Sequence, residues 1–233
     1  MFADCIKQRI HPATWAILGV TNTPQGAAMR HRGTAFAVDA QGHLVTCWHV
    51  LFRDNTLATE CDSFIAVQPD RGGVQHVAVV VGKEKDRDIA LLKIDGKVKT
   101  QPVKLYDGAV PSGTSCGGFG HPLSAVNTST NNIRIFSRAC AGIVSMAYTS
   151  PRFAETRLIQ LYELDFFAHG GASGGPNFMR NGDVFALVSG STLIDDGAGR
   201  KVQSNLSVSI DSREVIEFLK PFGVNADIRR GRS

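Results

Sequence analysis

The chain has 233 residues and a formal net charge of +4 at pH 7, and 43% of its residues are hydrophobic while 20% are charged. This balance is typical of a globular protein with a sizeable core, and the length suits one all-β domain. No segment is long and apolar enough to span a membrane, and no element concentrates Lys and Arg with interleaved aromatic residues. We therefore expect neither a membrane nor a nucleic acid as a partner.

The first residues and the cysteines bear on compartment and on metal chemistry. Residues 1–9 mix acidic and basic side chains without an apolar stretch, so they do not resemble a signal peptide. The short apolar run 13–20 is expected to form the first strand. Because the five cysteines are an odd number without metal-ligand spacing, we expect no metal, no cofactor and a reduced chain in the cytoplasm. A periplasmic protein whose leader has been removed is the alternative. The cysteines are Cys5, Cys47, Cys61, Cys116 and Cys140.

A candidate general base follows early in the chain. Residues 33–38 predict a strand, residues 39–42 a tight turn, and residues 43–51 a second strand that carries His49 toward its end. Taken alone, such a histidine is more often a core or edge residue than a catalyst. Its place before a polar loop makes it a candidate base if its partners follow in the expected order.

A candidate acid directly precedes the next apolar strand, residues 89–94. Asp88 adjoins that strand, so packing of the strand would fix the position of its carboxylate. Taken alone, Asp88 would usually be a solvated turn residue, and the neighbouring Asp86 competes with it. We favour Asp88 because of its contact with the strand.

Short strands separated by turn clusters make up most of the remaining chain. Turn signals lie at residues 69–73 and 181–183, and residues 95–103 are expected to connect two β halves. The further strands are expected at residues 64–67, 77–81, 133–136, 143–145, 158–164 and 184–188.

One helix is expected near the end of the chain. Asp211 precedes Glu214 by three residues, a variant of the capping box, and the apolar stripe that follows is stopped by Pro221. We expect this helix, at about residues 211–220, to pack on the second β half. The basic end, residues 228–233, is interpreted as a frayed terminus or a linker.

The most informative stretch is the sequence Gly-Gly-Ala-Ser-Gly-Gly-Pro at residues 170–176. A serine between glycines lies on a backbone that turns sharply and approaches a substrate closely, so Ser173 is a candidate nucleophile. The backbone N–H groups of Gly171 and Ser173 would together form an oxyanion hole, in which one donor typically contributes about 3–4 kcal/mol. The alternative is a Gly-rich hairpin turn with an ordinary serine.

The order His49, Asp88, Ser173 is the chymotrypsin order and differs from that of subtilisin and of the α/β-hydrolases. The chain resembles the trypsin-like, chymotrypsin-fold serine proteases, and most of all their bacterial HtrA-type branch. The matching segments, in order, are Gly33-Thr34-Ala35-Phe36, Thr46-Cys47-Trp48-His49-Val50, Asp88-Ile89-Ala90-Leu91-Leu92, Gly118-Phe119-Gly120-His121-Pro122-Leu123, Gly142-Ile143-Val144-Ser145 and the Ser173 loop with Asp165 upstream.

This resemblance implies the fold. The expectation is an all-β protein of two packed six-stranded antiparallel β-barrels with a C-terminal helix, forming one peptidase domain over residues 1–233. The first barrel is expected at about residues 10–95 and the second at about residues 103–210. No PDZ domain is expected within this chain.

The resemblance also implies a serine endopeptidase that acts on a protein or peptide through an acyl-enzyme. Ser173 would be the nucleophile, His49 the general base, and Asp88 the residue that orients and stabilises the imidazolium. Because no carboxylate lies at the expected base of the S1 pocket, a small or medium apolar P1 residue is expected, unless a shifted loop brings Asp165 into it. The expected S1 residues are Phe167, Ala168, Val188, Ser189 and Gly190.

Two positions depart from the pattern of secreted trypsins. Ala172 stands where those enzymes carry an aspartate that captures a new N-terminus, so we expect activity without N-terminal processing and an activating ligand or partner domain that orders the loop. Trp48 stands where a small residue is usual, and its side chain is expected either to pack under the site or to rearrange it.

Two alternatives to an active protease stay open. They are a catalytically silent peptide-binding module and a protease domain of a larger effector or polyprotein.

Overall fold

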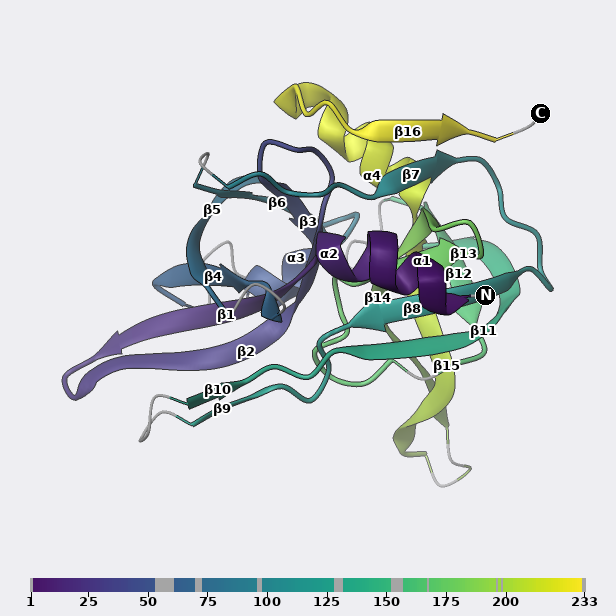
Figure 1. Ribbon diagram of the computed structural model, residues 1–233. Helices are drawn as coiled ribbons and strands as arrows, with labels where there is room; N and C mark the ends of the chain where they lie inside the picture. Colours follow the sequence, from purple (N-terminus) through teal and green to yellow (C-terminus); the bar gives the residue numbers. More distant parts are fainter. Residues whose placement is uncertain are drawn as a thin grey trace.

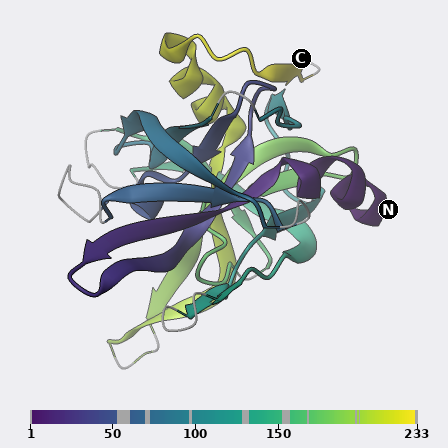
Figure 2. The same cartoon turned by 60° about the vertical axis from the view of Figure 1, so that its left-hand side comes forward.

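The computed structural model describes residues 2–52, 61–69, 73–95, 98–127, 132–151, 157–166, 168–195, 197 and 199–231. Two β-barrels lie side by side, the first on the left of Figure 1 and the second on the right, and Figure 2 shows the same arrangement from another side. Among the described residues, no helix has the length and apolar character that a membrane crossing requires.

The first barrel is closed and consists of six antiparallel strands, each paired with two neighbours. It begins with the apolar run predicted as the first strand, and its last strand is the predicted apolar strand that follows Asp88. In sheet order, the strands are β1 (Thr14–Thr23), β2 (Gly26–Ala37), β3 (His43–Thr46), β6 (Ile89–Ile94), β5 (Gln75–Glu84) and β4 (Ser63–Val67).

The second barrel also has six antiparallel strands, and it closes because its last strand in sheet order pairs back with the first. Two further strands, β7 (Lys104–Asp107) and β16 (Asp227–Arg230), extend the sheet beside β14 with parallel pairing. In sheet order, the barrel strands are β13 (Pro176–Met179), β8 (Ser115–Gly120), β11 (Arg138–Ser150), β12 (Ile159–Leu164), β15 (Lys201–Asp211) and β14 (Asp183–Asp195). The prediction of two six-stranded barrels is confirmed.

Helices and one small ribbon lie outside the barrels. The N-terminal segment crosses the front of the molecule in Figure 1, and the C-terminal helix lies at its top. The remaining elements are α1 (Phe2–Cys5), η1 (Ile6–Ile10), α2 (His11–Ala13), α3 (Trp48–Leu51), α4 (Ser212–Leu219), η3 (Lys220–Phe222) and the ribbon of β9 (Ala125–Asn127) with β10 (Asn132–Arg134).

The C-terminal helix is capped as its sequence predicts, but the capping box is only half used. Asp211 is the N-cap residue and accepts a hydrogen bond of 2.7 Å from the backbone N–H of Arg213. Glu214 does not reach back to the cap, because its carboxylate accepts from the Arg87 guanidinium at 2.9 Å. The helix is therefore tied to the first barrel as well as to the second.

Two predictions of local structure are wrong. The second predicted strand ends at Thr46, and His49 lies in the short helix α3, since the backbone turns back so that the N–H of Phe52 donates to the carbonyl of Trp48. The part of the basic end that the structure describes is not frayed, because β16 pairs with β7, and Arg229 forms an ion pair of 3.0 Å with the buried Asp183, while residues 232–233 lie outside the described residues.

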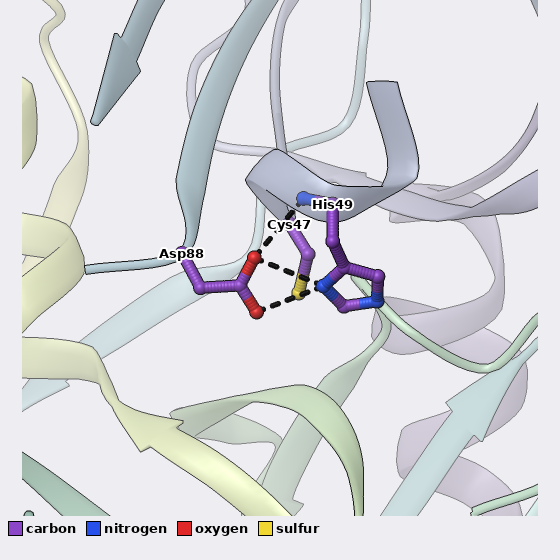
Figure 3. Close-up of side chains that lie close together, drawn as sticks. All are labelled: Cys47, His49 and Asp88. Atoms are coloured by element: carbon purple, nitrogen blue, oxygen red, sulfur yellow. Dashed lines mark hydrogen bonds and ion pairs between the residues drawn. The ribbon is translucent and has the colours of Figure 1, made fainter. Parts of the chain in front are cut away.

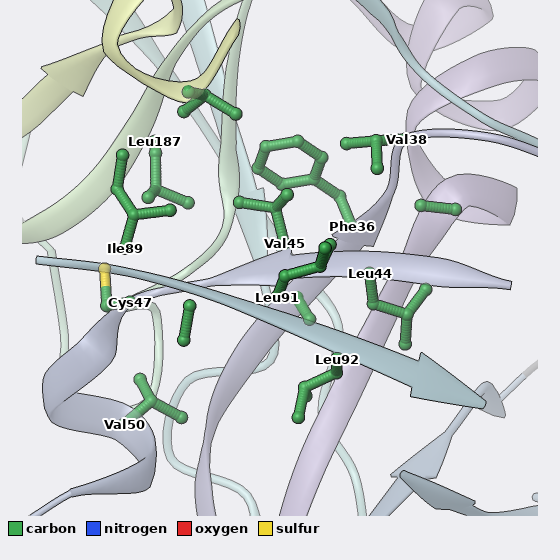
Figure 4. Close-up of a cluster of buried hydrophobic side chains, with 14 of the residues drawn as sticks. Phe36, Val38, Leu44, Val45, Cys47, Val50, Ile89, Leu91, Leu92 and Leu187 are labelled. Atoms are coloured by element: carbon green, nitrogen blue, oxygen red, sulfur yellow. The ribbon is translucent and has the colours of Figure 1, made fainter. Parts of the chain in front are cut away.

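The larger of two hydrophobic clusters runs through both barrels, and the smaller one lies within the second barrel. Figure 4 shows Phe36, Val45 and Leu91 of the first barrel packed beside Leu187 of the second. Each of these side chains is fully buried. Because apolar burial is the main favourable term in folding, this shared core fixes how the two barrels face each other. Residues contributed by different barrels can therefore be held at fixed distances.

Candidate active site

His49 and Asp88 face each other at the end of the first barrel (Figure 3). Helix α3 presents the His49 ring, and the turn before β6 presents the Asp88 carboxylate. His49 Nδ1 lies 2.9 Å from both carboxylate oxygens, and the backbone N–H of His49 donates to Asp88 Oδ1 at 3.0 Å. The structure thus brings together two residues that lie 39 positions apart in the sequence.

The Asp88 carboxylate is fully buried, and it is held by a hydrogen-bond partner from the second barrel as well. Ser189 Oγ donates to Asp88 Oδ2 at 2.5 Å, while Asp86, the competing acid, is half-buried in the preceding turn. Asp88 adopts φ of +57°, a left-handed conformation that aspartate tolerates better than most residues. A buried carboxylate needs such partners, because an unpaired buried charge is costly.

The partners of Asp88 fix the protonation pattern of the imidazole. An ionised carboxylate only accepts hydrogen bonds, so Nδ1 of His49 must carry the proton that faces it. In the neutral ring, Nε2 is then an acceptor, which is the tautomer that a general base needs. The His49 side chain keeps 27% of its surface exposed, so the ring is partly open to solvent.

Ser173 lies on a tight loop of the second barrel, close in space to Ser189, whose hydroxyl binds Asp88. Its Oγ is 3.5 Å from the carbonyl of Ser189. Gly174 has φ of +87°, and a Cβ there would lie 1.9 Å from the carbonyl oxygen of Thr34. Glycine is therefore required beside Ser173 so that the loop can approach the first barrel.

The carbonyl groups of this loop bind inside the protein. Thr34 Oγ1 donates to the Gly171 carbonyl at 2.8 Å, and the N–H of Leu123 donates to the Gly170 carbonyl at 3.0 Å. The Ala172 carbonyl accepts from the N–H of Gly175 at 2.9 Å. In a trans peptide the N–H points opposite to the preceding C=O, so the N–H groups of Gly171 and Ser173 point away from these partners. Neither N–H group therefore points toward the three partners that hold the carbonyls of this loop.

The predicted S1 residues lie in three different settings. Ala168 and Val188 line an apolar pocket of about 280 Å³, whereas Ser189 binds Asp88 and Gly190 pairs with Val208 of β15. Phe167 lies outside the described residues. The other lining residues are Gly118, Phe119, Gly120, Pro122, Arg138, Ala139, Cys140, Phe166, His169 and Ala172.

Two hydrogen bonds define the surroundings of that pocket. Ser191 Oγ donates to the Ala168 carbonyl at 3.1 Å, which holds the segment before the Ser173 loop against β14. Asp165 Oδ1 accepts from the N–H of Ile143 at 2.6 Å, so its carboxylate binds the backbone of β11 and is not among the lining residues. Among the described residues that line the pocket, Arg138 is the one Lys or Arg side chain and none is Asp or Glu.

The sequence analysis missed the contribution of Thr34 and of two histidines behind the loop, the fully buried His121 and the half-buried His31. Thr34 Oγ1 accepts from the N–H of His121 at 3.0 Å while donating to Gly171. The ring of His31 lies where a Cβ on Gly171 would be, 2.6 Å from it. Burial lowers the pKa of His31 to about 4 and that of His121 to about 3. His121 lies in one of the matching segments and His31 in none, but neither pattern indicates that the two histidines lie behind this loop, so only the fold reveals it.

Trp48 packs under the site rather than rearranging it. Its side chain is fully buried and stacks on Phe52 with a centroid distance of 5.3 Å, and the Lys85 ammonium lies 5.4 Å from the Trp48 ring centroid. The first residue of α3 is thereby anchored, which fixes the helix that presents His49.

Comparisons with known proteins identify relatives of this chain. The family described as trypsin-like peptidase domain matches residues 33–187. The putative protease Do-like 14 of Arabidopsis thaliana is 30% identical over 220 residues, which cover 92% of this chain and 47% of that protein. A probable periplasmic DegP-like serine endoprotease of Pseudomonas putida is 29% identical over 171 residues, covering 72% of this chain and 31% of that protein.

Solved structures share the fold. The HtrA-type protease AlgW with a decapeptide superimposes with a TM-score of 0.71 at 18% identity, covering 94% of this chain and 66% of that one. The chain spans about half or less of the length of the curated relatives named above.

Proposed function

This chain belongs to the family of trypsin-like peptidase domains, and we propose that it is a serine endopeptidase that cleaves peptide bonds through an acyl-enzyme on Ser173. The observation that carries the proposal is the arrangement around Ser189. Its hydroxyl binds the Asp88 carboxylate that holds His49, and its carbonyl lies beside Ser173 Oγ. One residue thus links the acid–base pair of the first barrel to the nucleophile loop of the second.

In the proposed reaction, Ser173 Oγ attacks the substrate carbonyl while its proton moves to His49 Nε2. The imidazolium that forms donates through Nδ1 to Asp88, whose negative charge stabilises it. The N–H groups of Gly171 and Ser173 receive the developing oxyanion. His49 then gives its proton to the leaving amine, and water releases the acyl group by the same steps in reverse order.

We propose a peptide substrate with a small or medium apolar P1 residue. The AlgW structure is described as containing a decapeptide, which supports a peptide ligand for this fold. The apolar pocket beside Ala168 and Val188 has no carboxylate among its lining residues and carries Arg138. A Lys or Arg side chain would be buried there without a counter-ion, which is costly. Cleavage profiling on a peptide library tests this preference, and selective cleavage after Arg or Lys would contradict it.

A fluorophosphonate probe tests the mechanism. We expect the probe to label the wild-type protein and to leave Ser173→Ala unlabelled, with nearly the same melting temperature for both. Ser204→Ala is the matched control, because it removes a serine from β15 and leaves the Ser173 loop intact. Peptide binding without labelling of the wild-type protein would instead favour the silent peptide-binding module.

The cellular setting stays a prediction. The described cysteines are all free thiols, which supports our proposal of a reducing compartment such as the cytoplasm. An activating ligand or partner domain also remains proposed, and the greater length of the relatives is compatible with further domains acting on this one. Activity measured on the natural full-length protein and on this chain alone tests that proposal.

A further inference from the structure

Cys47 lies directly beneath the His49–Asp88 pair. Figure 3 shows its side chain directed toward the space between the imidazole and the carboxylate. One ligand atom from each of Cys47, His49 and Asp88 lies within 4.8 Å of the other two. Cys47 Sγ donates to the carbonyl of Val188 at 3.1 Å, so the thiol is held in place by the second barrel. The mechanism proposed for peptide cleavage does not use this thiol.

We propose that Cys47, His49 and Asp88 form a binding site for Zn²⁺, and that Zn²⁺ bound there switches the protease off. Thiolate, imidazole and carboxylate are the ligand types that zinc takes in proteins. With zinc bonds of about 2.0–2.3 Å, neighbouring ligand atoms in a tetrahedral site lie about 3.3–3.6 Å apart. His49 Nδ1 and Asp88 Oδ2 are 2.9 Å apart and would separate slightly, whereas any ligand atoms that now lie as far as 4.8 Å apart would approach by about 1 Å.

Electrostatics also favours the site. Asp88 is a fully buried carboxylate, and Cys47 is equally buried. A divalent cation bound by one carboxylate and one thiolate gives a cluster with no net charge, which a buried site tolerates better than an isolated ion. Ser189 Oγ keeps its bond to Asp88 Oδ2 and orients the carboxylate, as outer partners of metal ligands commonly do.

The proton balance explains why binding would inhibit. Cys47 releases its thiol proton to solvent, and the cation takes the Nδ1 lone pair of His49, so the ring proton moves from Nδ1 to Nε2. One Zn²⁺ is bound and one proton is released in total. With a proton on Nε2, His49 becomes a donor toward Ser173 and no longer accepts the proton of its hydroxyl. Inhibition, unlike binding, rests on the proposed protease function.

The His49 ring controls access to the site. Cys47 and Asp88 are fully buried, whereas the His49 side chain is 27% exposed and covers them. The ring must swing aside for the cation to pass and then return to coordinate it. Inhibition is therefore expected to develop slowly and to reverse slowly with a chelator.

Cobalt spectroscopy tests binding without using protease activity. Co²⁺ is added to the full chain carrying Ser173→Ala, and we expect the visible bands of tetrahedral Co²⁺ together with a thiolate-to-cobalt charge-transfer band. Adding Cys47→Ala should remove the charge-transfer band. Cys116→Ala, which removes another fully buried thiol, should leave it unchanged. Persistence of the band in the Cys47→Ala protein would overturn the proposal.

Inhibition of labelling tests the consequence. In wild type, Zn²⁺ should slow fluorophosphonate labelling, and Cys47→Ala should raise the half-inhibiting concentration by about 100-fold or more, since even an outer-shell partner contributes about 10–100-fold in affinity. Equal inhibition of wild type and Cys47→Ala would overturn the inhibitory role. If wild type is never labelled, the proposed function fails while the cobalt experiment still decides the metal site.

Discussion

The two halves of the candidate site are held in opposite ways. His49 and Asp88 come from the first barrel and meet at one buried carboxylate, which binds the His49 ring, the His49 backbone N–H and the Ser189 hydroxyl. Ser173 comes from the second barrel on a loop whose shape depends on glycine and on backbone carbonyls. The acid–base half is therefore set by side-chain chemistry, and the nucleophile half is set by backbone conformation.

Each half also depends on the other barrel. Asp88 of the first barrel needs Ser189 of the second, and the loop around Gly171 needs Thr34 of the first. Such reciprocal bonds make the junction between the barrels, rather than either barrel alone, the unit that positions the site. Substitutions on the two sides should accordingly fail in different ways.

The largest effect is expected from the acid–base half. Asp88→Asn should reduce kcat about 10⁴-fold, because an amide no longer selects the Nδ1–H tautomer of His49. Asparagine tolerates the left-handed backbone of this position, so the fold should survive. Peptide hydrolysis and circular dichroism measure the two outcomes, with Asp86→Asn as the control. Retention of more than a tenth of the activity in Asp88→Asn would place the acid elsewhere.

In the nucleophile half, the second largest effect is expected from a substitution that the backbone conformation of the Ser173 loop does not allow. In Gly174→Ala, the added Cβ would lie 1.9 Å from the Thr34 carbonyl oxygen at a φ of +87°. We expect a loss of about 3 kcal/mol or more in the free energy of unfolding, together with loss of labelling. Gly170→Ala is the matched control, since a Cβ there meets nothing within 4 Å. Urea denaturation of both variants checks the contrast, and equal stability of the two would refute it.

The resemblance to the trypsin-like proteases predicted the two barrels, and apolar runs predicted most of their strands because such runs report directly on burial. The β6 strand was predicted with its observed bounds, Ile89–Ile94. The β8 strand, Ser115–Gly120, was not proposed as a strand, since its glycines give no such pattern. Its glycines are needed because side chains of other strands occupy their Cβ positions, such as Phe178 at Gly117.

The residue types of the candidate site were predictable from motif order, but their connections were not. His49, Asp88 and Ser173 stand out as motifs, and the structure places the first two in contact. Ser189 was assigned to substrate binding, whereas its side chain binds Asp88. Contacts between residues 101 positions apart depend on how two barrels pack, and no local pattern records that.

Acid should weaken the junction between the two halves. The pKa values of His31 and His121, lowered by burial to about 4 and about 3, lie below the ordinary value of 6.5. At pH values between the lowered pKa and 6.5, the unfolded chain binds protons that the folded chain does not. The contribution of these histidines to the free energy of unfolding is therefore fully present above pH 6.5 and is lost as the pH falls toward the lowered pKa values. Each histidine contributes a slope of up to about 1.4 kcal/mol per pH unit, so we expect a loss of about 2 kcal/mol from pH 6 to pH 5.

Denaturation midpoints at several pH values check this expectation. His121→Gln should reduce the slope, because one of the two imidazoles with a lowered pKa is gone. Ser204→Ala, which removes no imidazole, is the control variant. A pH profile of His121→Gln identical to that of the wild type would show that acid acts elsewhere.

The smallest effect is expected from the single hydroxyl that joins the halves. Thr34→Val keeps the shape of the side chain but removes Oγ1, which binds both the Gly171 carbonyl and the His121 N–H. A buried N–H left without a partner costs about 1–3 kcal/mol, and the loop loses one of its anchors. We expect kcat to fall about 10-fold, equivalent to about 1.4 kcal/mol in the activation barrier.

Thr34→Ser is the matched control, because it retains the hydroxyl and should restore most of this rate. If Thr34→Ser and Thr34→Val were equally impaired, the methyl group rather than the hydrogen bonds would set the loop. The backbone bond from Thr34 N–H to the Ser173 carbonyl, 2.8 Å long, is present in both variants, so the comparison isolates the hydroxyl.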